Sequence, residues 1–114
     1  MIETKLGDFE EVIMLMIGIL GEEEAYAFRI AEEFEAQTGR SVSIGAVHST
    51  LDRLEAKGFL TSKLGKATAV RGGKRKRIFN ITALGKRVLK GSMDFKLMLW
   101  KQFPALSAKL NFGV

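Results

Sequence analysis

The chain of 114 residues contains no cysteine, one histidine and one proline. The absence of cysteine excludes disulfides, thiolate nucleophiles and cysteine-based metal sites, and it suits a reducing cytoplasm. The single histidine has no evident set of metal ligands or glycine-rich phosphate loop to work with, so we expect neither an enzyme nor a cofactor. With one proline and no low-complexity segment, the sequence predicts a folded, globular chain.

Long hydrophobic runs are missing too. The apolar stretch at residues 12–20 is nine residues long, less than half of the roughly 20 residues that a membrane-spanning helix requires. The N-terminus lacks a basic region followed by an apolar segment and a cleavage site, so we expect no secretion signal. An apolar content of 46% is enough for one small core. These features predict a cytoplasmic protein with one folded domain.

The net charge of +5 is unevenly distributed along the chain. Residues 1–36 contain two basic and ten acidic side chains, for a charge of −8, whereas residues 37–114 contain 16 basic and three acidic side chains, for a charge of +13. This asymmetry predicts a polarised surface whose basic side faces a polyanion. Nucleic acid is the first candidate, ahead of an acidic membrane surface or an acidic protein.

Apolar periodicity predicts a first helix at about residues 8–20. Asp8 is its expected cap, and Glu10 and Glu11 lie in its first turn, where the helix dipole favours negative charge. The helix is apolar on nearly all sides, which suggests that a second subunit covers part of it, including Phe9 and Ile13. A helix fully enclosed in the core is the alternative.

A second, amphipathic helix is predicted at about residues 25–38, with Gly39 as its stop. Its glutamates Glu32, Glu33 and Glu35 have neither an apolar pocket nor a nearby base or metal ligand. We therefore interpret them as a solvated helix face and not as an acid/base site.

The stretch SVSIGAVHSTLDRLEAKGFL predicts a third helix with well-defined ends. Ser43 is a suitable N-cap, and Gly58 supplies a left-handed stop. Val47, Leu51 and Leu54 recur at i, i+4 and i+7, so they share one apolar face. The other face is rich in hydrogen-bonding groups. A second helix, a turn and this third helix complete a helix-turn-helix.

Two β-prone runs follow, at residues 59–64 and 77–82, with Gly72 and Gly73 between them as a flexible turn. A helix that can enter a groove, followed directly by a cationic hairpin, is the winged form of the helix-turn-helix. The predicted fold class is α+β, mainly α, with three helices, a β-hairpin wing and a C-terminal helix. Five of the seven residues at 71–77 are cations that call for an anionic partner: Arg71, Lys74, Arg75, Lys76 and Arg77.

At this point the sequence resembles the PadR family of bacterial transcriptional regulators. The resemblance covers about residues 6–89 and is carried by GAVHSTLDRLEAKGFL in the recognition helix, RGGKRKRIFNIT in the wing and TALGK at the start of the last helix. Where the family would have tyrosine and proline, this chain has His48 and Ser49. His48 could donate to a phosphate or a base edge; a solvated histidine on the helix face is the alternative.

The resemblance implies that residues 1–82 form a DNA-binding domain. We expect small and polar residues at the start of the third helix to approach the major groove and cations to neutralise phosphates. Arg53 could instead pair with Asp52 or Glu55, and the wing could be a merely solubilising loop. The expected DNA-binding residues are Arg40, Ser43, Gly45, Ala46, His48, Ser49, Arg53, Lys63, Arg71, Lys74, Arg75, Lys76 and Arg77.

The last predicted helix, residues 83–104, begins after Thr82 as a cap and ends at Pro104, ahead of a tail at 105–114. Large apolar side chains crowd its second half, and one helix on a small domain cannot bury them alone. The sequence therefore predicts a two-fold homodimer, which the resemblance also implies because the family dimerises through this helix. The expected dimerisation residues are Phe9, Ile13, Met93, Leu97, Trp100 and Phe103.

Trp100 raises the question of an effector. Resemblance to short family members implies a planar aromatic ligand between paired tryptophans at the dimer interface, whereas the sequence alone favours a core aromatic. The expected function is a dimeric regulator, most often a repressor in this family, that binds a palindromic operator on double-stranded DNA. A protein-interaction module on a winged-helix frame is the alternative, and RNA binding is disfavoured by the lack of aromatic platforms among the basic residues.

Overall fold

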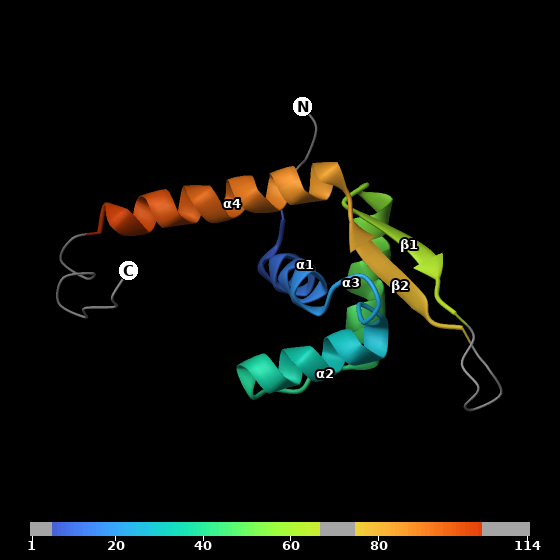
Figure 1. Ribbon diagram of the computed structural model, residues 1–114. Coiled ribbons are helices and arrows are strands. Elements are labelled where there is room, and N and C mark those ends of the chain that lie inside the picture. The colour runs from blue at the N-terminus through green and yellow to red at the C-terminus, as the bar shows by residue number, and fades with distance from the viewer. Residues whose placement is uncertain (1–5, 67–74, 104–114) are drawn as a thin grey trace.

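The computed structural model describes residues 6–66 and 75–103 (Figure 1). Within these ranges the order of elements is three helices, a hairpin and a long fourth helix, which confirms the predicted winged helix-turn-helix with an additional C-terminal helix. The elements are α1 (Asp8–Leu20), α2 (Ala27–Thr38), α3 (Ile44–Ala56), β1 (Leu60–Leu64), β2 (Arg77–Ile81) and α4 (Ala83–Lys101).

Local hydrogen bonds define the helix ends where the sequence predicts them. The Ser43 hydroxyl accepts from the amide of Ala46 at 3.1 Å, and the Thr82 hydroxyl accepts from the amide of Gly85 at 2.9 Å. Gly39 and Gly58 have φ values of 74° and 83°, in the left-handed region that favours glycine. These local features therefore mark the end of α2, both ends of α3 and the start of α4.

The predicted bounds of α1 are confirmed, but its N-cap is Gly7 and not Asp8, which is already the first helical residue. The second helix starts at Ala27 and not at Ala25, because Tyr26 has an extended backbone with φ −116° and ψ 160°. The connection between α1 and α2 is held to the hairpin by a hydrogen bond of 2.9 Å from the amide of Phe79 to the carbonyl of Ala25.

The core lies where α1 packs against α2, α3 and β2. Ile13 is fully buried there, so its expected place at a subunit interface is wrong, and the enclosed-core alternative holds for this residue. Phe9 is half-buried, and its ring meets that of Phe34 edge-on, with centroids 5.7 Å apart. The largest fully buried side chains are Phe59, Ile13, Met14, Ile30, Leu51, Leu54, Leu60 and Val47.

The strands β1 and β2 form an antiparallel hairpin with Leu60 opposite Ile81 and Leu64 opposite Arg77. Beyond the ladder, the amide of Gly65 donates to the carbonyl of Lys76 at 2.6 Å. The described part of the hairpin therefore forms the base of the wing. The predicted turn at Gly72 and Gly73 lies outside the described residues.

Helix α4 docks on the domain through its first turns and then extends past it (Figure 1). Gly85 is buried against the carbonyl of Phe59, and a Cβ at this position would lie only 2.3 Å from that oxygen. A side chain here would therefore push α4 away from the hairpin. Val88 and Leu89 pack against the core, whereas Leu84 is 40% exposed. In the described ranges no helix is long and apolar enough to cross a membrane.

Candidate nucleic-acid interface

Helix α3 has one buried and one exposed face. Its inward residues are Val47, Thr50, Leu51 and Leu54. The five residues that the sequence assigned to the start of the recognition surface all lie on its outer side and are exposed: Ser43, Gly45, Ala46, His48 and Ser49. This end of α3 is therefore free to meet a ligand along its polar face.

Gly45 is not required by the packing of the domain. A Cβ at this position would meet no heavy atom within 4 Å, and the backbone is helical without a positive φ. Nothing in the described residues thus explains the glycine. A close approach of an external surface to the helix backbone would explain it.

The base of the wing carries four of the predicted cations. Lys63, Arg75, Lys76 and Arg77 are exposed on β1, on β2 and just before β2. The predicted residues Arg71 and Lys74 lie outside the described ranges. The two strands thus present a basic edge within the part of the hairpin that the structure describes.

Hydrogen bonds orient this basic edge. Arg77 donates from Nε to the Ser62 hydroxyl at 2.9 Å, and Ser62 in turn donates to Glu55 of α3 at 2.7 Å. Arg75 donates from Nε to the carbonyl of Gly65 at 2.8 Å. The relay through Ser62 ties the second wing strand to the recognition helix, so the two surfaces are held in a fixed relation.

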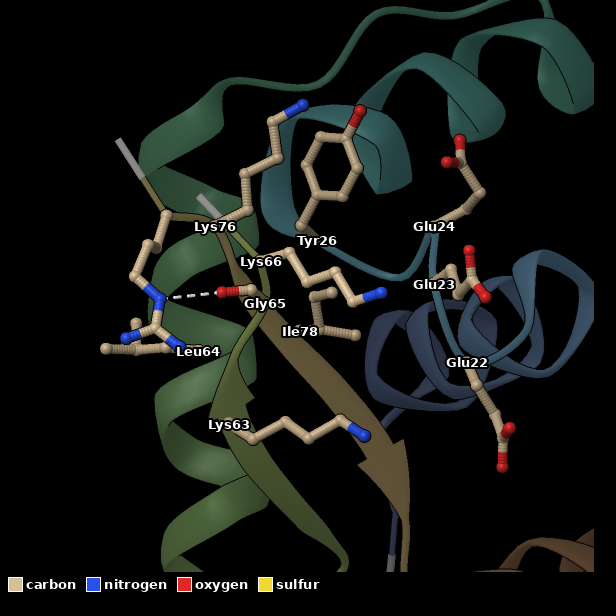
Figure 2. Close-up of a pocket in the computed structure, with 11 residues that line it drawn as sticks. Glu22, Glu23, Glu24, Tyr26, Lys63, Leu64, Gly65, Lys66, Lys76 and Ile78 are labelled. Carbon is tan, nitrogen blue, oxygen red and sulfur yellow. Dashed lines mark hydrogen bonds between the residues drawn. The ribbon is translucent and has the colours of Figure 1, made fainter. Parts of the chain in front are cut away.

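A cavity of about 500 Å³ lies between the base of the wing and the connection from α1 to α2 (Figure 2). Figure 2 shows Lys76 beside the Tyr26 ring, and the ammonium nitrogen lies 4.2 Å from the ring centroid, a cation–π distance. The other charged lining residues are Lys63, Lys66 and Arg75 on the wing side and Glu22, Glu23 and Glu24 on the other. The acidic turn thus lies opposite the basic wing.

Arg53 departs from its predicted role. Its Nε donates to Glu10 of α1 at 3.1 Å, and Lys57 Nζ lies 2.9 Å from the same carboxylate oxygen. Neither Asp52 nor Glu55, the two partners considered from the sequence, takes this place. The side chain of Arg53 is 52% exposed, whereas that of Glu10 is 7% exposed. Arg53 is thus a structural partner of a buried carboxylate, which limits its availability to phosphates.

The adjacent Glu11 makes the corresponding contact on the other side of α1. Glu11 accepts a hydrogen bond from the hydroxyl of Ser92, and its Oε1 forms an ion pair of 2.5 Å with Nζ of Lys96. Both partners lie on α4. The side chain of Glu11 is 6% exposed. Glu10 and Glu11 therefore hold α3 and α4, respectively, to the first turn of α1.

The surroundings of these carboxylates lower their pKa values. Burial raises the pKa of Glu10, but hydrogen bonds from the Gly7 amide, Lys57 and Arg53 more than offset it, so the pKa lies below its ordinary value of 4.5. Burial likewise raises the pKa of Glu11, and hydrogen bonds from Lys96 and Ser92 bring it below 4.5. Both side chains are charged at neutral pH and act as ion-pair partners.

Comparison with known proteins identifies the family. A family model described as "Transcriptional regulator PadR-like family" matches residues 16–91. The chain belongs to the PadR-like family. Its members are transcriptional regulators and not enzymes, and no group of three or more histidine, aspartate or glutamate side chains that could hold a metal ion occurs in the part of the chain that the structure describes.

Solved structures of PadR-like proteins share the fold. A PadR-like regulator from Bacillus cereus aligns over 83% of this chain and 89% of its own, with a TM-score of 0.65 and 19% identity. A PadR-family regulator from Eggerthella lenta aligns over 83% and 80%, with a TM-score of 0.62 and 24% identity. Bacillus subtilis PadR in complex with operator DNA aligns over 75% and 47%, with a TM-score of 0.58 and 22% identity. No curated protein matches the chain.

The PadR-like fold brings part of the predicted site together. The C-terminal end of α3 and the base of the wing are joined through Glu55 and Ser62, while Arg40 lies exposed in the turn before the polar start of α3. Trp100 is half-buried near the end of α4, where the centroid of its ring lies 6.3 Å from that of Phe103.

The sequence did not reveal the roles of Glu10 and Glu11. A signal exists for Glu10, because it lies three and seven residues before the buried Ile13 and Ile17 and therefore shares their face.

The lowered pKa values predict loss of stability in acid. The unfolded chain takes up protons at Glu10 and Glu11 near pH 4.5, before the folded chain does, so their stabilisation is present above that pH and is lost as pH falls through the lower folded pKa values. We expect Glu10→Gln and Glu11→Gln each to reduce the free energy of unfolding by about 1–3 kcal/mol at pH 7 and to flatten its decline below pH 4.5. Urea unfolding at a series of pH values measures both effects.

Glu35→Gln is the matched control, because it removes one carboxylate from an exposed position on α2. It should retain the wild-type dependence of the unfolding free energy on pH. An equal flattening in Glu35→Gln would show that the overall charge, and not the two buried ion-paired carboxylates, causes the acid sensitivity.

Proposed function

We propose that this PadR-like chain is a dimeric, DNA-binding transcriptional repressor that recognises a palindromic operator. Residues 1–82 form the DNA-binding domain, and residues 83–104 the dimerisation segment, in which α4 ends at Lys101 and not, as the sequence predicts, at Pro104. The observation that carries the proposal is the joint exposure of the polar start of α3 and the cations of the wing base, with the wing tied to the other end of the same helix through Ser62 and Glu55. A helix and a basic hairpin in a fixed relation suit the groove and the flanking phosphates of duplex DNA.

The two surfaces have different tasks. His48 and Ser49 project from α3 with free hydrogen-bonding groups and can read base edges in the major groove. Lys63, Lys76 and Arg77 lie on or beside the wing strands and carry no sequence information, but they can neutralise phosphates. The Bacillus subtilis neighbour with operator DNA supports the assignment, since 75% of this chain aligns with that structure.

Helix α4 supports a dimer. Met93, Leu97 and Trp100 follow one another at intervals of four and three residues and so share a stripe. Leu97, at the centre of this stripe, is 46% exposed in the single chain. Burying such side chains releases roughly 1.5–3 kcal/mol each. A second copy of α4 offers a matching surface, and two-fold symmetry then presents two recognition helices to a palindrome.

A protein-interaction module is the second candidate, because apolar side chains are exposed away from α4 as well. Phe28 of α2 is 70% exposed, and Ile19 of α1 is 60% exposed. A partner protein could cover them. This candidate predicts little DNA binding at any salt concentration, so the next experiment separates it from the first.

Removing the charges at the wing base should weaken DNA binding without changing sequence preference. The triple variant Arg75→Gln, Lys76→Gln and Arg77→Gln loses up to three phosphate contacts. The plot of log affinity against log salt between about 50 and 200 mM should therefore become less steep by about 0.9 for each contact. Gel shifts with genomic fragments selected by the wild-type protein measure the slope and the preference.

The matched control replaces three exposed cations of α4 in the same way: Lys86, Lys90 and Lys101. This variant has the same net charge as the wing variant and should keep the wild-type slope. Equal losses of slope in both variants would show that net charge alone is responsible. A wild-type protein without steep salt dependence would favour the protein-interaction module.

Gly45→Ala should separate folding from DNA binding. The added methyl group meets nothing in this protomer, so alanine should stabilise α3 by roughly 0.5–1 kcal/mol. If the backbone of α3 approaches the duplex closely, the same methyl group should lower operator affinity about tenfold. Gly91→Ala is the control, because Gly91 is exposed on α4 with equally open space around it. If Gly45→Ala binds the operator with wild-type affinity, the α3 backbone at Gly45 does not approach the duplex closely.

Leu97→Glu should disrupt the dimer. A carboxylate in the α4 stripe opposes burial, so we expect the dimer dissociation constant to rise by at least roughly tenfold, while the monomer remains folded because Leu97 is exposed in it. Light scattering measures the mass, and Leu64→Glu, at an exposed leucine of β1, should remain dimeric. A dimeric Leu97→Glu would exclude this stripe as the interface.

The same variant addresses the effector, which we place at Trp100 in the dimer. Trp100 is the one tryptophan of the sequence, so its fluorescence reports on this site. Planar cationic aromatic compounds should quench it saturably in the wild-type dimer but not in Leu97→Glu, and Trp100→Phe should remove the signal. Absence of saturable quenching in the dimer would exclude such an effector.

A further inference from the structure

Helix α1 lies between the recognition helix and the C-terminal helix (Figure 1). Its first turn carries two consecutive carboxylates that reach opposite neighbours. Glu10 contacts Arg53 and Lys57 of α3, and Glu11 contacts Ser92 and Lys96 of α4. The two contacts join segments that are 43 to 85 residues apart in the sequence.

Both carboxylate oxygens of Glu10 accept hydrogen bonds, and two of the donors are on α3. One Glu10 oxygen accepts from the Gly7 amide at 2.8 Å and from Lys57 at 3.0 Å, and the other accepts from Lys57 at 2.9 Å and from Arg53 at 3.1 Å. Arg53 also donates to the buried Thr50 hydroxyl at 3.3 Å. Because the Glu10 carboxylate is buried, removing its partners would leave an uncompensated charge, so α3 is held firmly at this point.

Polar side chains make the contact between Glu11 and α4, beyond the first turns of that helix. Helix α4 packs on the domain mainly through β2, near its own N-terminus. Farther along, Ser92 and Lys96 meet Glu11 beside a cavity of about 510 Å³, whose lining includes Leu6, Arg87 and Phe95. Val88 and Leu89 pack against the core about one turn earlier in α4, so beyond them the charge-assisted hydrogen bonds of Glu11 add a directional restraint on the helix.

We propose that Glu10 and Glu11 are positioning residues for DNA recognition, which together fix the direction of α4 relative to α3. This inference rests on the proposed function. If α4 pairs two copies, its direction decides how far apart the two recognition helices lie. Half-sites on one face of a duplex are separated by about one helical turn, or 34–36 Å. The adjacent carboxylates would thus set the half-site spacing that the dimer accepts.

The test compares operators that differ only in spacing. The probe is a palindromic duplex selected by the wild-type protein from a random pool, together with versions that have one base pair inserted or removed between the half-sites. The readout is the ratio of affinities for the selected and altered spacings. Overall loss of affinity or stability cancels in this ratio, so a merely structural role would leave it unchanged.

We expect the ratio to fall by roughly five- to tenfold in Glu11→Gln and in Glu10→Gln. Lys96→Gln changes the other side of the α4 contact at a side chain that is 53% exposed, and it should lower the ratio similarly. The double variant Glu11→Gln with Lys96→Gln should cause no greater loss than either change alone, because both remove one interaction. Glu35→Gln is the control and should keep the wild-type ratio.

Two results would overturn the inference. An unchanged spacing ratio in dimeric Glu11→Gln or Lys96→Gln would show that Glu11 does not position the recognition helices. A wild-type protein that binds no duplex in a salt-dependent manner would overturn the proposed function and this inference with it. The two failures are distinguishable, because the first leaves wild-type operator binding intact.

Discussion

The structure depends on two buried carboxylates at the start of α1. Glu10 and Glu11 are almost completely enclosed, so each requires partners that compensate its lost hydration. The partners come from α3 on one side and α4 on the other. Apolar packing around Ile13 brings α1, α2 and α3 together, but it is non-directional. The ion pairs add direction, because charge-assisted hydrogen bonds fix the angle as well as the distance between helices.

The sequence predicts the parts of the fold that depend on neighbours along the chain. Ser43 and Thr82 cap their helices through residues three positions ahead, and Gly39 and Gly58 end helices through their own backbone conformation. Such interactions are readable because both partners lie within one helical turn. The start of α2 differs, since the 25–26 segment is extended and its Ala25 carbonyl bonds with Phe79, a contact that periodicity cannot reveal.

The same distinction applies to the candidate site, where local spacing predicts one part and tertiary contacts determine the other. The exposed face of α3 follows from its apolar spacing, since Val47, Leu51 and Leu54 fix which side turns inward. The pairing of Arg53 with Glu10 does not follow, because the two are 43 residues apart and the sequence offers nearer acids. A charge pattern indicates which residues could attract a polyanion, but only the tertiary fold shows which cations are already neutralised within the protein.

Helix α4 meets its own domain first through apolar and then through polar side chains. Val88 and Leu89 pack against the core, and Ser92 and Lys96 face Glu11. Farther along, Leu97, Met98 and Leu99 are exposed. Their exposure is unfavourable for an isolated chain, but it suits a helix whose apolar side is completed by a second copy. The polar side then has a separate task, because it links this apolar surface through α1 to the recognition helix.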